Sequence, residues 1–368
     1  MPVVIGQVVS LTGNNPGGSE NQLGAQLAVA ELNSQGGLLG GQHVELLLAD
    51  DRTQPSHAVT AFANLVDHGV CAVVGTSFSN ASLAILPEAE AARVPYISTG
   101  AADSQVQPVR PYAFMTPPTA TAVAEQLLRY FKAQKLTKLA IAYDDNSMFA
   151  KTGLEKQTQL AGEHGVEFVH LEKFHVDTTD FEPMLTRIQS SGADAIMAWA
   201  TGPPAVELVR QRPADLPFVM SHGNSDQRFL DATGATAEGV IAAASLGLVA
   251  GELPASDVRD AGVSFTKAFQ ERHGRSPSSY AIDGYTAVML IASAISRAGS
   301  DEPKKVRDSL EGLETTTPQG RYHYSASDHQ GLNADQVAVT TIENGRFVLT
   351  EWSRNELAVT MNTHRRLP

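Results

Sequence analysis

The residues best suited to chemistry lie between Cys71 and Asp103, where hydroxyl and amide side chains follow two short apolar runs. Ser79 and Asn80 come after the first run, and Thr99 comes after the second. Hydroxyls and unused backbone N–H groups bind anions, and the N-terminus of a helix adds a favourable dipole. This stretch therefore predicts non-covalent recognition of an anionic group such as a carboxylate. The alternative is that Ser79 only caps a helix and that the glycine after Thr99 only makes a turn.

Three elements must position these side chains. The apolar run 71–74 is typical of a strand buried on both faces, and Pro95 marks the start of a second extended segment. Between them, residues 81–92 are rich in Ala, Leu and Glu and predict a helix, with Ser79 or Asn80 as its N-cap. In a parallel sheet the two strand ends would lie side by side, at the edge where ligands bind.

Motif fragments of catalytic and cofactor sites are present but incomplete. The pattern Gly13-x-x-x-x-Gly18-Ser19 resembles a phosphate-binding loop but lacks the lysine that reaches the phosphates. Ser79 occupies the position where a nucleophile elbow needs its second glycine. No His-x-x-x-His or Glu-x-x-His pair lies on a predicted helix. We therefore expect no enzyme activity, no cofactor and no metal site.

Length, charge and cysteine usage limit the classes of protein to which this chain can belong. Its 368 residues predict about two domains, and its formal net charge of −13 argues against nucleic acid as a partner. The single cysteine excludes an internal disulfide. The chain begins Met1-Pro2 and enters a strand at once. We therefore expect either a cytoplasmic protein or an exported one whose signal is absent from this sequence.

Predicted strands and helices alternate in two series, which is the pattern of two α/β units with parallel sheets. The first series covers residues 3–115, with a loop rich in Gly and Asn at 11–19. The second begins after Pro117-Pro118 and ends with a strand at 239–244.

The last third of the chain has a different pattern. Three predicted helices have no strand between them, so they must pack on an existing sheet: 265–273, 281–298 and 303–310. Residues 315–331 are polar and predict irregular structure. Two final strands, 336–342 and 346–352, are joined by the hairpin signal Asn344-Gly345 and also need a sheet to join.

Short blocks in a fixed order along the chain carry a likeness to a known family. They are IGQVVSLTG at 5–13, AELNSQGG at 30–37, LADD at 48–51, VVGTSFS at 73–79, PYISTGA at 95–101, GADAI at 192–196 and AIDGYTA at 281–287. No single block is specific, but the ordered set is. It resembles the type I periplasmic binding proteins, and within them the branched-chain-amino-acid-binding branch that serves ABC importers.

The resemblance implies an α/β fold of two Rossmann-like lobes with parallel central sheets, joined by a three-strand hinge. The lobes would be 1–118 with 251–324, and 119–250 with 325–368. The late helices would cover the first sheet, and the terminal strands would join the second. A ligand that contacts both lobes only when they are shut would favour the shut state.

The resemblance also implies where a ligand binds. The Ser79 loop and the turn after Thr99 would hold a carboxylate, although Ala102 stands where the family often has a threonine. Phe149 and Phe78 would contact the apolar body of the ligand, and two turns of the second lobe would face it. The predicted ligand-binding residues are Ser79, Asn80, Phe78, Thr99, Gly100, Ala101, Ala102, Phe149, Thr201, Gly202, His222, Gly223 and Asn224.

The ammonium group of an amino-acid ligand would need an acidic partner. Amino-acid binders of this family typically have an acid near His222 or Gly223, and here only Asp226 or Asp145 could take its place. We expect a small carboxylate, either a hydrophobic or branched-chain amino acid or, as the alternative, an aromatic or other amine-free acid. A cytoplasmic amide-type sensor of the same fold is a further alternative.

The resemblance implies partners and location as well. The expected partner is an ABC permease in the membrane, and the protein itself is expected to be a monomer. It would act in the periplasm or as a cell-surface lipoprotein.

Overall fold

The computed structural model describes residues 1–13 and 17–364 and divides the chain into two compact units. The first unit contains Met1–Pro117 and Ala261–Leu332, and the second contains Pro118–Asp260 and Asn333–Pro368. The chain therefore passes between the units three times. The second and third passages, at 260/261 and 332/333, come later than the expected positions 250/251 and 324/325. Residues 14–16 of the predicted Gly-rich loop and 365–368 of the predicted second lobe lie outside the described residues.

The first unit is built on a five-stranded sheet in the order β2-β1-β3-β4-β5, in which all neighbours are parallel. β3 and β4 are short and buried along their whole length, because the apolar runs that form them have neighbours on both faces. The strands are β1 (Val3–Val9), β2 (Val44–Asp50), β3 (Ala72–Val74), β4 (Tyr96–Ser98) and β5 (Ala113–Met115).

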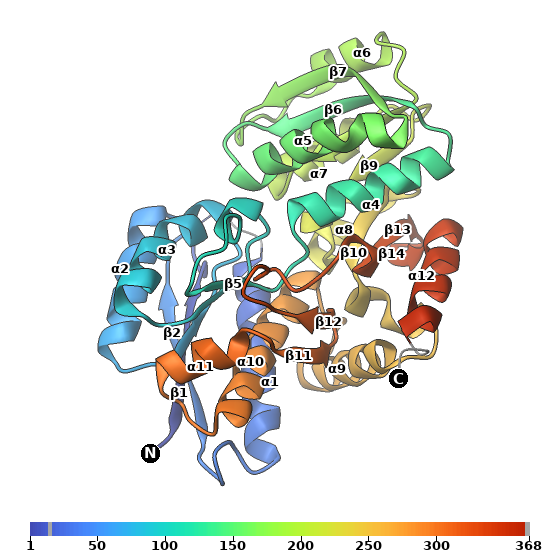
Figure 1. Cartoon of the computed structure of the whole chain (residues 1–368). Helices are drawn as coiled ribbons and strands as arrows, with labels where there is room; N and C mark the ends of the chain where they lie inside the picture. The colour runs from blue at the N-terminus through green and yellow to red at the C-terminus, as the bar shows by residue number, and fades with distance from the viewer. Residues whose placement is uncertain (14–16, 365–368) are drawn as a thin grey trace. The chain divides into compact units, whose positions relative to one another are not determined.

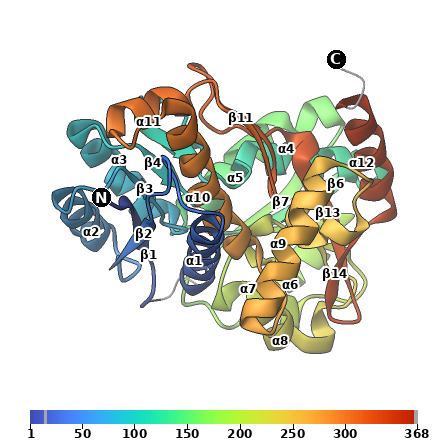
Figure 2. The same ribbon diagram turned by 90° about the horizontal axis from the view of Figure 1, so that it is seen from below.

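Helices from both ends of the first unit's sequence cover its sheet, as predicted. Figure 2 shows α2 and α3 on one face and α1 and α10 on the other, and α10 contacts both α1 and β3. The helices are α1 (Gly18–Ser34), α2 (Pro55–Asp67), α3 (Ser79–Ala92), η1 (Asp103–Gln105), α10 (Ser279–Ala298) and α11 (Pro303–Leu310). Helix α9 (Asp257–His273) contains the boundary between the units.

The backbones of α1 and α10 approach each other closely. A Cβ at Gly24 would lie 1.9 Å from the backbone oxygen of Ala281, and one at Gly284 would lie 2.0 Å from that of Asn21. Both distances are far inside van der Waals contact, so only glycine fits at these two positions. The late helix is thus held against the early one by backbone packing.

The prediction of irregular structure over 315–331 is wrong for the first part of this region, although 324–331 contain no helix or strand. This region contains an antiparallel pair, β11 (Glu314–Thr317) and β12 (Gly320–His323). The residues that follow cover the outer edge of β5. His329 lies 2.8 Å through Nδ1 from the oxygen of Ala113, and the hydroxyl of Tyr324 donates to the oxygen of Met115 at 2.7 Å. An exposed sheet edge pairs with other chains, so this covering protects the unit.

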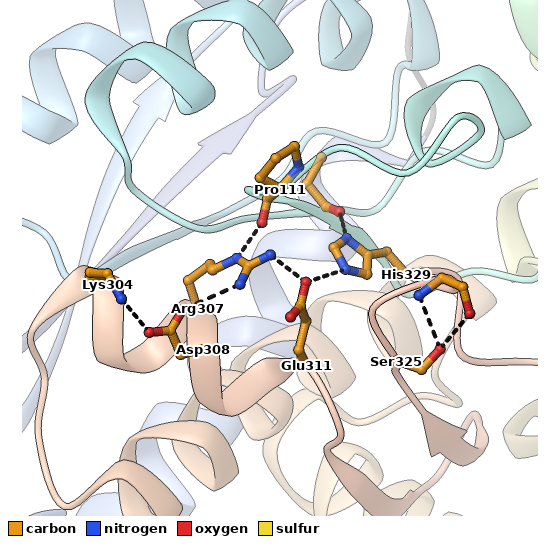
Figure 3. A network of polar contacts seen from close by, with 9 residues as sticks. Pro111, Lys304, Arg307, Asp308, Glu311, Ser325 and His329 are labelled. Atoms are coloured by element: carbon orange, nitrogen blue, oxygen red, sulfur yellow. Dashed lines mark hydrogen bonds and ion pairs between the residues drawn. The ribbon is translucent and has the colours of Figure 1, made fainter.

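A network of charged groups supports the cover of β5 (Figure 3). The second ring nitrogen of His329 lies 3.3 Å from a carboxylate oxygen of Glu311, which also pairs with Arg307. Arg307 in turn donates to the oxygen of Pro111 at 2.6 Å. The ring of His329 stacks on Phe114 with centroids 4.0 Å apart. Helix α11 and the residue after it are therefore tied to the start of β5 and to His329, which covers this strand.

The second unit is built on a seven-stranded sheet in the order β14-β13-β10-β9-β8-β6-β7. Its central strands are parallel, and β13 joins β10 in antiparallel fashion, so the terminal strands do find a sheet to join. The strands are β6 (Lys138–Asp144), β7 (Glu167–Phe174), β8 (Ala195–Trp199), β9 (Phe218–Met220), β10 (Ile241–Ser245), β13 (Val337–Glu343) and β14 (Arg346–Leu349).

The second unit's sheet is also covered on both faces. Helices α6, α7 and α8 share a buried core with alternate residues of β6, β8 and β9, whereas α5 packs on the opposite face against Trp199. The helices are α4 (Ala120–Ala133), α5 (Met148–Leu160), η2 (Ala161–His164), α6 (Glu182–Gln189), α7 (Pro203–Gln211), η3 (His222–Asn224), α8 (Gln227–Thr233), η4 (Gly234–Ala237), η5 (Leu246–Glu252), η6 (Ala334–Gln336) and α12 (Glu351–His364).

The predicted strand 346–352 is too long. β14 ends at Leu349 and α12 begins at Glu351, because the hydroxyl of Thr350 accepts a hydrogen bond from the N–H of Ser353 at 3.1 Å and caps the helix. The α/β class with two parallel-sheet units is nevertheless confirmed (Figure 1). Along residues 1–13 and 17–364, no helix has both the length and the apolar character that crossing a membrane requires.

Candidate ligand-binding site

In the first unit, the loops after β3 and β4 meet at Ser79. A Cβ at Gly100 would lie 3.0 Å from Oγ of Ser79, and this Oγ accepts a hydrogen bond from the N–H of Ala102 at 3.3 Å. The structure thus brings together Ser79 and the turn Gly100–Ala102, which are far apart in sequence. We call Ser79 with residues 99–102 the first-unit cluster.

The prediction that Ser79 or Asn80 caps the helix is wrong. α3 begins at Ser79 itself, and Phe78 takes the N-cap position without a side-chain hydrogen bond. The oxygen of Ser79 is therefore used across the loop rather than on its own helix. Phe78 is half-buried and packs against the apolar core of the first unit, whereas Asn80 is the second residue of α3.

Two hydrogen-bond donors of the first-unit cluster remain available. The hydroxyl of Ser79 accepts from Ala102, and among the described residues it has no acceptor for its own hydrogen. The N–H of Ala101 likewise finds no acceptor in the described part of the chain. The hydroxyl of Thr99, in contrast, donates to Asn21 of α1 at 3.0 Å, so Thr99 anchors the turn. The available groups are neutral donors, which suit an oxyanion.

In the second unit, the predicted site residues cluster around aromatic rings. The ring of Phe149, at the start of α5, meets the ring of His222 edge to face with centroids 5.4 Å apart. A Cβ at Gly223 would lie 2.5 Å from Cγ2 of Thr201 and 3.7 Å from Phe149. We call Phe149, Thr201, His222 and Gly223, with Trp199, the second-unit cluster.

Trp199 is the member of this cluster that the sequence analysis missed. Its ring lies 5.2 Å from that of Phe149, its indole N–H donates to Gln157 at 2.8 Å, and a Cβ at Gly153 would overlap it. The apolar strand 195–199 ends with this tryptophan, at the edge where the site was expected, and that position was the available signal.

Two other predicted residues have local structural roles. The side chain of Asn224 donates to the backbone oxygen of Ala200 at 2.7 Å and so ties its turn to the end of β8. Gly202 is the N-cap of α7, where its φ of 70° lies in the left-handed region. Its backbone conformation, and not a side chain, is what the turn requires.

The two acids proposed as ammonium partners differ in how many of their carboxylate oxygens already have a partner. Asp226 caps α8 by accepting from the N–H of Phe229 at 2.9 Å, and its other oxygen lies 3.6 Å from Arg228. Asp145 lies 3.7 Å from Lys173 through Oδ2, but its buried Oδ1 has no partner among the described residues. Asp145 therefore has free acceptor capacity, whereas both oxygens of Asp226 are engaged.

His222 is uncharged at neutral pH. Burial lowers the pKa of His222 to about 4, because the charged imidazolium would lose its hydration. Its Nδ1 is buried without a partner among the described residues. The second-unit cluster is thus a group of mostly buried aromatic rings with a neutral polar atom.

Replacing His222 by glutamine should flatten the acid side of the pH–stability profile. Below pH 6.5 the unfolded chain protonates His222, but the folded protein does not until about pH 4, so stability falls as pH drops through this window. The difference amounts to roughly 3 kcal/mol at ~1.4 kcal/mol per pH unit. Thermal melts of both proteins at pH 7 and pH 4 measure it, with exposed His43→Gln as control. Parallel profiles for wild type and His222→Gln would contradict the burial effect.

Known proteins match this chain over nearly its whole length. The family model described as periplasmic binding protein matches residues 2–346. An amino acid binding protein of Pseudomonas aeruginosa is 26% identical over 357 residues, which cover 94% of this chain and 91% of that protein. A leucine-, isoleucine-, valine-, threonine- and alanine-binding protein of the same organism is 22% identical over 344 residues, which cover 92% of this chain and 86% of that protein.

Solved structures share the fold. The branched-chain amino acid transporter substrate binding protein LivJ of Streptococcus pneumoniae, in complex with isoleucine, superposes with a TM-score of 0.84 at 25% identity, covering 94% of this chain and 98% of that one. An ABC transporter solute binding protein of R. palustris, in complex with benzoate, has a TM-score of 0.82 at 18% identity, covering 95% of each. With its two parallel-sheet units and this extended match, the chain belongs to the type I periplasmic binding proteins, which are solute-binding proteins rather than enzymes, in the branch of the Leu/Ile/Val-binding proteins.

Proposed function

We propose that this protein is an extracytoplasmic solute-binding protein of an ABC importer and that it binds a small carboxylate with an apolar body. The observation that carries the proposal is the pair of donors in the first-unit cluster, the hydroxyl of Ser79 and the N–H of Ala101. They suit the two oxygens of a carboxylate. The protein would deliver its ligand, as a monomer, to a membrane permease.

The first candidate ligand is a hydrophobic amino acid. The relatives named for leucine, isoleucine and valine support it, as does the S. pneumoniae structure that holds isoleucine. Of the two acids considered, Asp145 is the one whose Oδ1 has capacity to accept from an ammonium. A buried ammonium without such a partner costs several kcal/mol, so an acid at this position would decide whether amino acids bind.

The second candidate is an aromatic acid without an amine. It is favoured by the aromatic rings of the second-unit cluster, by the neutral state of His222 and by the engagement of Asp226 in the cap of α8. Aromatic rings in edge-to-face contact contribute about 0.5–1.5 kcal/mol beyond burial, so a ligand ring would gain by joining the cluster.

Calorimetry with leucine, phenylalanine and their deaminated analogues separates the two candidates. If the ligand is an amino acid, leucine or phenylalanine should bind at least tenfold more tightly than its analogue, and Asp145→Asn should remove that advantage. Equal or tighter binding of the analogues would exclude the amino-acid candidate. Binding of neither class would contradict the carboxylate proposal itself.

Replacing Ser79 by alanine should weaken binding of the preferred ligand about tenfold or more. A hydrogen bond to a charged group contributes ~1.5–3 kcal/mol, and each 1.4 kcal/mol is tenfold in affinity. The apo protein should lose only about 1 kcal/mol of stability, because Ala102 loses one long hydrogen bond. Titration and thermal melts of the same variant test both statements. A large loss of stability with unchanged affinity would assign Ser79 a purely structural role.

A further inference from the structure

Gln105 is buried directly beneath the turn that forms half of the first-unit cluster. It is the last residue of η1 and has no exposed surface. Its side-chain N–H groups donate to the backbone oxygens of Gly100 at 2.9 Å and Ala102 at 3.1 Å. Its side-chain oxygen accepts from the hydroxyl of Ser98 at 2.5 Å. One side chain therefore holds two of the three carbonyls of the turn.

The two backbone carbonyls fix the orientation of this amide, and a one-way chain of hydrogen bonds leads to its oxygen. The N–H of Thr76 donates to the hydroxyl of Tyr96 at 2.7 Å, which lies 2.6 Å from the hydroxyl of Ser82. Ser82 lies 2.7 Å from the hydroxyl of Ser98. Because Ser98 gives its only hydrogen to Gln105, Ser82 must donate to Ser98, and Tyr96 to Ser82. The chain thus ends at the amide oxygen of Gln105, and the nitrogen faces the turn because the carbonyls of Gly100 and Ala102 can only accept.

The direction of the Ala101 N–H follows from these contacts. The carbonyl of Gly100 and the N–H of Ala101 belong to one planar trans peptide and so point in opposite directions. Because Gln105 draws the Gly100 carbonyl into the interior, the N–H of Ala101 must point away from it. The N–H of Gly100 is meanwhile occupied by Ser98 at 3.0 Å.

We propose that Gln105 is a positioning residue for ligand recognition: it sets the direction of the Ala101 N–H that receives the ligand carboxylate. The inference rests on the proposed function, because it assumes a carboxylate at this N–H. Gln105 itself would not touch the ligand. Gln105 would order the turn before the ligand arrives, so binding would not carry the entropic cost of ordering it.

The first test is the affinity of Gln105→Leu for leucine, phenylalanine and their deaminated analogues. The leucine side chain nearly keeps the volume but cannot donate to Gly100 or Ala102, so affinity for the probe that wild type binds best should fall about tenfold or more. Gln126→Leu is the matched control, because Gln126 is a buried glutamine that donates to a backbone oxygen, that of Val337, at 3.1 Å in the second unit. It should leave affinity within about twofold.

A double-mutant cycle separates positioning from general destabilisation. Ser79 and the Ala101 N–H are proposed to hold the same carboxylate, so the losses from Ser79→Ala and Gln105→Leu should combine to clearly less than their product. The affinity losses from Ser79→Ala and Gln126→Leu, in contrast, should multiply. If Gln105→Leu does not fold, Gln105→Asn serves in its place, because the shorter amide cannot reach both carbonyls.

The outcomes distinguish this inference from the proposed function. If wild type binds none of the four probes, the carboxylate proposal fails and this inference fails with it. If wild type binds and the Gln105 variants bind equally well, the positioning role alone is overturned. Multiplicative losses with Ser79→Ala would also overturn it.

Discussion

Replacing Gly284 by alanine should destabilise the first unit by at least about 3 kcal/mol, which is the upper end of the usual range for overpacking. A Cβ at this position would lie 2.0 Å from the backbone oxygen of Asn21. No side-chain rotation can relieve that contact, so α1 and α10 would have to separate. The gain in helix propensity on replacing glycine, about 1 kcal/mol, offsets only part of the loss.

The position of the two tryptophans makes this destabilisation measurable. Trp199 and Trp352 both belong to the second unit, so their fluorescence reports that unit, whereas circular dichroism reports both. Gly284→Ala should shift the circular dichroism transition to lower denaturant ahead of the fluorescence transition. Gly162→Ala is the control, because a Cβ there meets no heavy atom within 4 Å. Transitions that stay unchanged in Gly284→Ala would show that the two helices can separate at little cost.

The α1–α10 contact also bears on ligand recognition. Asn21, whose backbone opposes Gly284, accepts the hydroxyl of Thr99 through its side chain and donates to the backbone oxygen of Tyr280 at 2.9 Å. The turn that presents the Ala101 N–H is therefore braced by α1 on one side and by Gln105 beneath it. A shift of α1 should disturb binding even though no residue of α10 belongs to the first-unit cluster.

Much of the fold could be predicted because local patterns agreed with the final contacts. The apolar run at β3, the Asn344-Gly345 turn and the strandless helices all have signals in the nearby sequence. β11 and β12 were missed because their residues are polar and pair across a short turn, where burial gives no alternating apolar pattern. The start of α12 differs from the prediction because the expected strand 346–352 includes Thr350, whose hydroxyl instead caps the helix.

The sequence predicted which positions form the candidate site, but it did not predict which contacts their side chains make. Strand ends indicated Ser79 and Gly100, yet the expected cap at Ser79 was wrong because its oxygen meets Ala102 from the next loop. Gln105 carries no motif, and its role depends on two carbonyls that point inward only in the folded turn. Such contacts depend on tertiary placement, which no pattern of residue types encodes.

Replacing Asp283 by asparagine should stabilise the protein at neutral and alkaline pH. Asp283 lies on α10 with 4% of its surface exposed, and no described residue forms a hydrogen bond or ion pair with its carboxylate. Burial therefore raises the pKa of Asp283 well above its ordinary value of 3.8. Thr286, one turn away on the same face, has a buried hydroxyl that also lacks a partner among the described residues.

The sign of the pH dependence follows from proton binding. Above pH 3.8 the unfolded chain releases the Asp283 proton while the folded protein keeps it, so wild-type stability falls as pH rises toward the raised pKa. The loss is ~1.4 kcal/mol per pH unit across this window. Asparagine has nearly the same shape and does not titrate. The stability gained by Asp283→Asn should therefore be small near pH 4 and should grow as pH rises toward the raised pKa.

Thermal melts at pH 4.5, 6 and 7.5 measure this trend. Asp67→Asn is the control, because Asp67 is exposed at the end of α2 and lacks the burial that affects Asp283. An Asp283→Asn gain that does not change with pH would mean that the carboxylate has the same pKa in the folded and unfolded protein. A loss of stability at every pH would mean that Asp283, in its acidic form, makes a specific contact that an amide cannot replace. A gain that rises with pH would instead identify Asp283 as a buried acid that weakens the first unit, next to the glycines that hold α1 and α10 together.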